Sequence, residues 1–244
     1  MKRDLLPAVS ALSTALEDYD DAQARALLED LIEWLGVDVV ATEVVPLLLR
    51  VLKRRWLCNQ ACLAQRDFAC GTLKDCLLQF AQGWAQGQGP RAVLASTSGL
   101  QREISLIGFG LALRRCGWRI SYLGCDAPIA ILIDTVRALG PRLVALSLPP
   151  DATPGQVSPE LRALAAEVPM AIFGASLPLA DSLGAMPIGD DLNAEAKALT
   201  GDIELKAQSL QPAGSVAGSA RLIKQCHSAI FNHRCCSSTT GIHP

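Results

Sequence analysis

Nine cysteines and three histidines are the side chains of this sequence best suited to binding a metal ion. Cys58 and Cys62 are one helical turn apart, so their thiolates could share a metal, but no histidine or second cysteine pair lies near them in the sequence. The last segment offers a zinc-type set whose spacing matches no standard zinc pattern: Cys226, His227, His233, Cys235 and Cys236. We therefore expect no metal site, packing roles for the first six cysteines, and a disordered end.

The sequence contains few residues in arrangements typical of a catalytic site. No Ser-His-Asp set is indicated, because all three histidines lie at or beyond position 227. The stretch SGLQRE lacks the Gly-Lys-Ser/Thr of a phosphate loop, and 244 residues cannot contain both a carrier domain and a barrel of eight βα units. Asp126, in GCDAP, could contact a ligand or cap the next helix, with Pro128 in the first turn; we expect the capping role. We expect a protein that is not an enzyme.

The stretch from Pro90 to Leu123 predicts a strand, a helix and a second strand. RAVLAS is a short apolar run, STSG interrupts it, EISLIGFGLALRR repeats apolar residues at helical spacing, and RISYL is extended. The glycines of GFG fall inside the helix, where they permit close packing on a sheet. A right-handed crossover between parallel strands places ligands beyond their carboxyl ends, so loops 97–103, 124–128 and 147–156 are the expected binding loops.

Strands and helices continue to alternate after this unit. The predicted strands are Arg91–Ser96, Arg119–Leu123, Leu143–Leu148, Met170–Gly174 and Met186–Ile188. The predicted helices are Glu103–Arg115, Ile129–Leu139, Ser158–Ala166 and Leu192 to about Thr200. The pattern predicts a doubly wound α/β sheet with the strand order 2-1-3-4-5.

The first part of the chain has helical periodicity from Asp20 to about Gly83. One amphipathic helix ends at Gly36, a second contains Pro46 either as a kink or near its start, and a third runs from about Ala61. Gly and Gln alternate just before Pro90, which is typical of a linker. We predict a helical cap domain over residues 1–86, an α/β domain over 90–205 and a tail over 206–244.

The composition fits a soluble globular protein. Half of the 244 residues are hydrophobic, 19% are charged and the net charge is −2, so no basic field favours direct binding of nucleic acid. The acidic start is unlike a signal peptide, and no stretch is long and apolar enough for a membrane span. We expect a cytoplasmic protein with no membrane partner.

One family resemblance covers residues 15–200. A Trp late in the second predicted helix, the run GLQREISLIGFGLALRRCGWRISYLGCDAP and a strand ending in LVALS resemble the cobalamin-binding module of MerR-type, CarH-like bacterial transcriptional regulators. The resemblance implies a four-helix-bundle-like cap followed by a flavodoxin-like, Rossmann-type sheet. Because only about twenty residues precede the bundle, it also implies a ligand-sensing part without the family's DNA-binding domain.

The family signature is Asp/Glu-x-His-x-x-Gly after the first strand, a Ser after the third and Gly-Gly after the fourth. In the family the His is the lower ligand of cobalt, while the Ser and the glycines surround the nucleotide tail of the cofactor. Here the loop reads LQREIS, with Arg102 at the His position; the Ser is Ser147, and Gly-Gly has become Gly174-Ala175. Arginine keeps its proton and cannot ligate cobalt.

The cap differs from the family pattern in a parallel way. The family Trp, followed ten and eleven residues later by Glu-His above the corrin, corresponds here to Trp56, Arg66 and Asp67. The resemblance therefore holds for the scaffold and fails at the metal. The candidate cofactor-binding residues that it implies are Trp56, Arg66, Asp67, Gly99, Gln101, Arg102, Ser105, Asp126, Ser147, Gly174 and Ala175.

Three interpretations of these substitutions remain open. Cobalamin could bind with water or its own benzimidazole beneath the cobalt. The cleft could instead be empty or hold another ligand, with Asp67 and Arg102 paired across it. Both residues could also simply be solvated, after drift in a copy no longer selected for the cofactor. We expect a non-catalytic sensor or regulatory module of the cobalamin-binding type; the alternatives are a cofactor-free protein–protein interaction module and a corrinoid carrier subunit of a methyltransferase. The apolar first and second helices suit a protein partner or a homo-oligomer.

Overall fold

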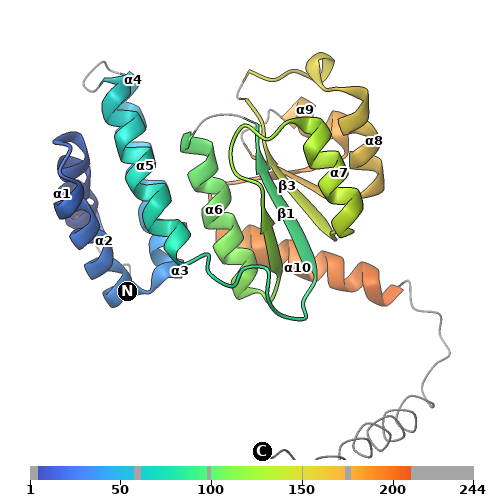
Figure 1. Cartoon of the computed structure of the whole chain (residues 1–244), viewed down its shortest axis with the longest axis horizontal. Coiled ribbons are helices and arrows are strands. Elements are labelled where there is room, and N and C mark those ends of the chain that lie inside the picture. Colours follow the sequence, from blue (N-terminus) through green and yellow to red (C-terminus); the bar gives the residue numbers. More distant parts are fainter. Residues whose placement is uncertain (1–4, 58–61, 98–99, 150, 174–176, 210–244) are drawn as a thin grey trace, which may run out of the picture. The chain divides into compact units, whose positions relative to one another are not determined.

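Five parallel strands form one sheet at the centre of this computed structural model, in the order β2-β1-β3-β4-β5 (Figure 1). Their bounds are β1 Arg91–Ser96, β2 Arg119–Tyr122, β3 Leu143–Ser147, β4 Met170–Phe173 and β5 Met186–Ile188. β1 pairs with both β2 and β3, so Ser96, the last residue of β1, lies beside Ser147, the last residue of β3. The predicted flavodoxin-like order is confirmed.

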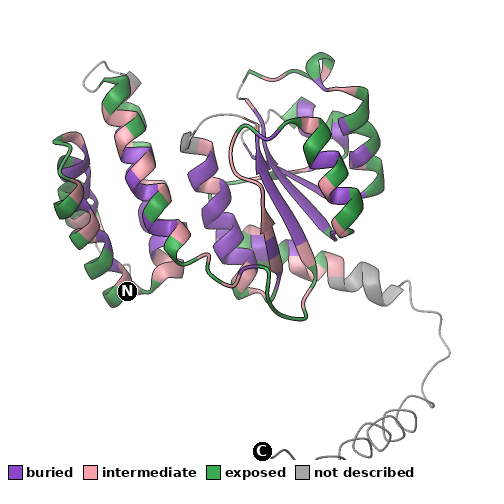
Figure 2. Cartoon of the chain, in the orientation of Figure 1, coloured by how far each residue is buried: buried purple, intermediate pink, exposed green. Residues whose placement is uncertain are grey.

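Alternate residues of each strand face opposite sides of the sheet. Ala92 and Leu94 of β1 belong to one buried cluster, while Val93 and Ala95 belong to another. The three central strands β1, β3 and β4 are buried almost throughout because helices cover both faces, whereas the edge strands β2 and β5 are mostly only partly buried (Figure 2). Such burial explains why these strands are continuous apolar runs in the sequence.

Helices α6 (Leu100–Arg115) and α10 (Leu192–Ser209) cover the face of Ala92 and Leu94. The opposite face is covered by α7 (Ile129–Leu139), α8 (Pro159–Glu167) and α9 (Leu177–Leu183). Helix α9 and the short 3-10 turn η2 (Pro154–Gln156) were not predicted from the sequence. Helix α7 has the bounds that the sequence predicted.

The cap consists of four main helices, α1 (Leu6–Glu17), α2 (Asp21–Leu35), α4 (Val45–Leu57) and α5 (Leu63–Gln79). Gly36, at φ +87°, ends α2 as predicted. One helical turn, α3 (Val37–Val39), and a π-helical segment, η1 (Val40–Val44), then lead into α4. Pro46 is therefore the second residue of α4, and the wide turn before it accommodates a residue that has no backbone N–H to donate.

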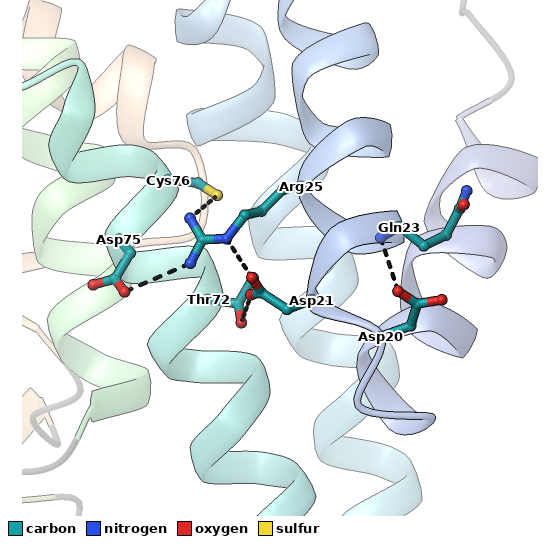
Figure 3. A network of polar contacts seen from close by, with 7 residues as sticks. All are labelled: Asp20, Asp21, Gln23, Arg25, Thr72, Asp75 and Cys76. Carbon is teal, nitrogen blue, oxygen red and sulfur yellow. Dashed lines mark hydrogen bonds and ion pairs between the residues drawn. The ribbon is translucent and has the colours of Figure 1, made fainter.

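Polar contacts join α2 to α5 within the cap (Figure 3). The Arg25 guanidinium donates to Asp21 Oδ2 at 2.7 Å and lies 3.7 Å from Asp75 Oδ2, and Thr72 Oγ1 donates to Asp21 Oδ1 at 3.1 Å. The bond from Arg25 lowers the pKa of Asp21 below its usual value. Asp20 begins α2 by accepting from Gln23 N at 2.9 Å.

The cap packs against the α/β layer mainly through α5 and η1 on α6. Gly108 in α6 makes this approach close, because a Cβ atom there would lie 3.0 Å from the carbonyl oxygen of Ala41 in η1. Asn193 Nδ2 of α10 also donates to Thr42 Oγ1 of η1 at 2.6 Å. Gly110 packs on the sheet as the sequence indicated, since a Cβ atom there would lie 2.8 Å from Leu94 Cδ2 of β1, whereas Gly108 packs on the cap.

The structure describes residues 5–57, 62–97, 100–149, 151–173 and 177–209. The contacts divide the chain into a unit that ends at Ile203 and a second that begins at Glu204. None of the described helices is both long enough and apolar enough to cross a lipid bilayer.

Candidate functional site

A pocket of about 320 Å³ lies between the cap helix α4 and the carboxyl ends of β4 and β5. From α4 it receives Pro46, Leu49, Arg50 and Lys53, which follow the i, i+3, i+4, i+7 spacing of one helix face. The other walls come from α6, from the last residues of β4 and β5, and from the start of α10: Arg102, Ser105, Phe173, Ile188, Gly189, Asp190 and Leu192. Both the cap and the α/β layer therefore line it.

Positive charge dominates the polar wall of the pocket. Arg50 NH1 lies 3.6 Å from Asp190 Oδ2, and both side chains are well exposed. Arg102 is half-buried, and burial lowers its pKa because the charged guanidinium loses water; the charge of Asp151 opposes this only partly. Among the described residues, no carboxylate lies within ion-pair distance of Arg102.

Two of the residues singled out in the sequence, Arg102 and Ser105 of α6, line this pocket. The sequence prediction missed the cations of α4, although their spacing from Pro46 marks one helix face. Of the three expected binding loops, only 97–103 contributes a described residue to the wall, Arg102. The other described wall residues come from α4, from Ser105 of α6, from the ends of β4 and β5, and from the start of α10.

The cap residues singled out in the sequence lie elsewhere. The ion pair proposed between Asp67 and Arg102 is not formed, because Asp67 accepts from the adjacent Arg66 at 2.9 and 3.0 Å. The indole of Trp56 is half-buried, and its buried Nε1 has no hydrogen-bond partner among the described residues. None of the three lines the pocket.

Ser147, at the end of β3, is completely buried. Its carbonyl oxygen accepts from both the backbone N and the Oγ1 of Thr97 at 3.0 Å, but its own Oγ has no partner in the described part of the chain. The hydroxyl at this strand end therefore has an unmet capacity for hydrogen bonding. The neighbouring candidates Gly99, Gly174 and Ala175, and the side chain of Gln101, lie outside the described residues.

The expected capping role of Asp126 is wrong. The N-cap of α7 is Pro128, with no side-chain bond, and Asp126 instead adopts the left-handed conformation at φ +55°. Asp tolerates this region better than most residues. The turn is held by Ala127 N, which donates to Ser96 O at 3.1 Å.

A buried polar cluster beside α6 was not found from the sequence. Glu103 is fully buried, and its Oε1 lies 2.9 Å from Lys74 Nζ of α5 and accepts from the Tyr122 hydroxyl at the end of β2. Its Oε2 has no partner among the described residues. Burial first, and then the bond to Glu103, raise the pKa of Tyr122. Burial, and then the nearby charge of Glu103, raise the pKa of Cys125.

The amino-acid sequence of this chain is similar to those of two transcriptional repressors. The chain is 46% identical over 59 residues to the HTH-type transcriptional repressor CarA of Myxococcus xanthus, covering 24% of this chain and 20% of CarA. It is 27% identical over 137 residues to the repressor CarH of the same organism, covering 56% of this chain and 46% of CarH. The chain is a homologue of CarA and CarH. It spans less than half the length of either repressor, and no protein-family model matches it.

A solved structure supports the fold. The monomethylamine corrinoid protein of Methanosarcina barkeri superposes with a TM-score of 0.64 at 14% identity, covering 81% of this chain and 99% of that protein. The predicted fold, a helical cap on a Rossmann-type parallel sheet, is confirmed by this likeness.

The residues present fit a corrinoid only in part. The orphaned Ser147 hydroxyl suits the hydrogen-bonding tail of such a cofactor. Arg102, at the signature position of the cobalt ligand, does not fit, because a guanidinium has no lone pair to offer a metal and repels a cationic one. The described residues also contain no group of three His, Cys, Asp or Glu side chains arranged for a metal ion.

Proposed function

We propose that this chain is a non-catalytic regulatory module of the cobalamin-binding type, which senses a small ligand in the pocket between α4 and α6. One observation carries the proposal: Lys53 of the cap and Arg102 of the α/β layer line the same pocket. A ligand that touches both layers favours the arrangement of cap and sheet to which it binds best. Its occupancy then changes the cap surface that a protein partner, or a second copy of the chain, contacts.

The relatives support a regulatory role. CarA and CarH are named as transcriptional repressors, and the stretches they share with this chain include more than half of it in the case of CarH. The Methanosarcina barkeri relative in fold is named as a corrinoid protein, which makes cobalamin the first ligand to test. Ser147 would bond the nucleotide tail, and water or the cofactor's own benzimidazole would lie beneath the cobalt, since Arg102 cannot ligate it.

The test combines absorption spectroscopy with hydrogen exchange. The purified chain is incubated in the dark with adenosylcobalamin or hydroxocobalamin and desalted, and its spectrum is recorded. We expect any corrinoid that is retained to lack histidine ligation, and to slow amide exchange in α4 as well as in α6. Protection confined to α6 and the strands would contradict a signal passed to the cap.

A cofactor-free protein–protein interaction module is the second candidate. It is favoured by the buried contact between Lys74 and Glu103, which already holds α5 on α6 without a ligand. A colourless protein after desalting from both corrinoids would favour this candidate over a cobalamin sensor. The third candidate, a corrinoid carrier, requires in addition that the retained cofactor accept and release a methyl group.

A further inference from the structure

We infer that the pocket between α4 and α6 binds a small oxyanion, a phosphate or carboxylate group, in place of a cobalt centre. The inference rests on the proposed function, because it names the ligand class of the same pocket. It starts from the disagreement between the scaffold, which is that of a corrinoid protein, and Arg102, which stands at the cobalt-ligand position.

The charges of the pocket wall favour an anion. Arg50, Lys53 and Arg102 contribute three cations, whereas Asp190 contributes the one carboxylate among the described lining residues. Asp190 faces Arg50 at 3.6 Å, and both side chains are mostly exposed, so this pair neutralises only the rim. Lys53 and Arg102 are left to provide the attractive field for a negative group, which the charge of Asp151 near Arg102 offsets only in part.

The state of Arg102 points the same way. Its guanidinium is half-buried and lies within ion-pair distance of no carboxylate that the structure describes. A guanidinium stripped of water is stabilised by two parallel bonds to the oxygens of a carboxylate or phosphate. Ser105, also in the pocket wall and less than one turn further along α6, adds a hydroxyl donor on the same side.

The size of the pocket suits a small ligand. A volume of about 320 Å³ is at the lower end of the roughly 300–1,000 Å³ that small-molecule sites occupy. Apolar residues such as Leu49 and Phe173 complete the wall, so the pocket can hold a compact acid with its charged group on Arg102.

Calorimetric titration of the full chain at low ionic strength tests the inference. Inorganic phosphate and succinate are titrated separately, which distinguishes a phosphate site from a carboxylate site. We expect saturable binding of at least one of them, weakened at least about tenfold by Arg102→Gln, since a charge-assisted bond is lost. Asp190→Asn removes a repelling charge and should tighten binding by about two- to fivefold. Arg54→Gln, on the exposed side of α4, is the matched control and should leave it unchanged.

Two results would overturn the inference: no saturable binding of either anion to the wild-type chain, or equal affinity of the wild type and Arg102→Gln. Circular dichroism of each variant excludes unfolding as the cause of a loss, and the expected gain in Asp190→Asn cannot arise from unfolding. Hydrogen exchange separates this inference from the proposed function. If an anion binds but exchange in α4 does not change, regulation is refuted and the anion site stands. If a corrinoid changes exchange in α4 but no anion binds, the anion site is refuted and regulation stands.

Discussion

Replacing Lys74 by Met isolates the charge of Glu103 inside the protein. The Lys74 ammonium lies 2.9 Å from Glu103 Oε1, and the carboxylate is 0% exposed. Lys74 keeps 24% of its side-chain exposure, so its own charge reaches water more easily than that of its partner. The hydroxyl of Tyr122 would remain as a neutral donor to the carboxylate, which is too little to replace an ammonium.

The expected loss follows from this asymmetry. Removing one partner of a buried ion pair leaves an uncompensated charge, which costs about 3–5 kcal/mol. We take the lower end, about 3 kcal/mol, because Tyr122 still donates and because water near the partly exposed Lys74 screens its attraction to Glu103. With a urea m-value of about 2 kcal/mol/M, the unfolding midpoint should fall by about 1.5 M. The double variant Lys74→Met with Glu103→Met should recover most of this loss, since an apolar pair removes the stranded charge.

Urea unfolding followed by circular dichroism measures the free energy of unfolding of the wild type, the two single variants and the double variant. Lys197→Met, an exposed lysine of α10, is the matched control and should change the free energy of unfolding by less than about 0.5 kcal/mol. If Lys74→Met behaved like this control, the carboxylate of Glu103 would have to reach water, and the buried contact between α5 and α6 would be refuted.

Three further predictions concern titration, packing and thiol reactivity. The pKa of Tyr122 is raised above 10.0, so its contribution to stability is complete below about pH 10 and is lost at higher pH. Above about pH 10 the urea midpoint should therefore fall less steeply with pH in Tyr122→Phe than in the wild type. A Cβ atom on Gly89 would lie 1.8 Å from the carbonyl oxygen of Gly117, so Gly89→Ala should lower the free energy of unfolding, measured by urea unfolding, by about 2 kcal/mol or more. Gly155→Ala is the control and should change this free energy little, because no atom lies within 4 Å of a Cβ atom there. Cys62 is exposed and its hydrogen bond with Tyr19 lowers its pKa, whereas burial raises the pKa of Cys70 to about 12. Peptide mapping after brief iodoacetamide treatment should therefore find Cys62 alkylated before Cys70. Alkylation of Cys70 before Cys62 would contradict these environments.

Much of the α/β layer could be predicted because its signals are local. The strand at 91–96 and the helix at 129–139 have the expected bounds, since apolar runs between Gly and Pro mark them clearly. Helix α1 was not predicted; it has no side-chain N-cap to mark its start, although Leu12 and Leu16 prove to be core residues. Helix α9 has only seven residues, which is too short for a clear period.

The candidate site was less predictable because it depends on contacts between distant segments. Arg102 was recognised by its place in a signature, but Lys53 and Asp190 join it only through the packing of the cap on the sheet. The predicted pairing of Asp67 with Arg102 was wrong because Asp67 pairs with its neighbour in the sequence, Arg66. Nothing in the local sequence marks Glu103 as buried, since an acidic residue in the first turn of a helix is normally exposed.

The π-helical segment η1 holds one residue more than an α-helical turn would. A π turn completes one rotation about the helix axis with about one residue more than an α turn, so the extra residue is absorbed within η1 and does not rotate the helix that follows. The face of Pro46, Leu49, Arg50 and Lys53 therefore lines the pocket in spite of this extra residue. Deleting one residue between 40 and 44 would convert the π turn into an α turn and keep this face on the pocket, whereas deleting one residue inside α4 before Leu49 would rotate Arg50 and Lys53 by about 100°. The wide turn thus separates the length of the cap segment from the direction in which its cations point.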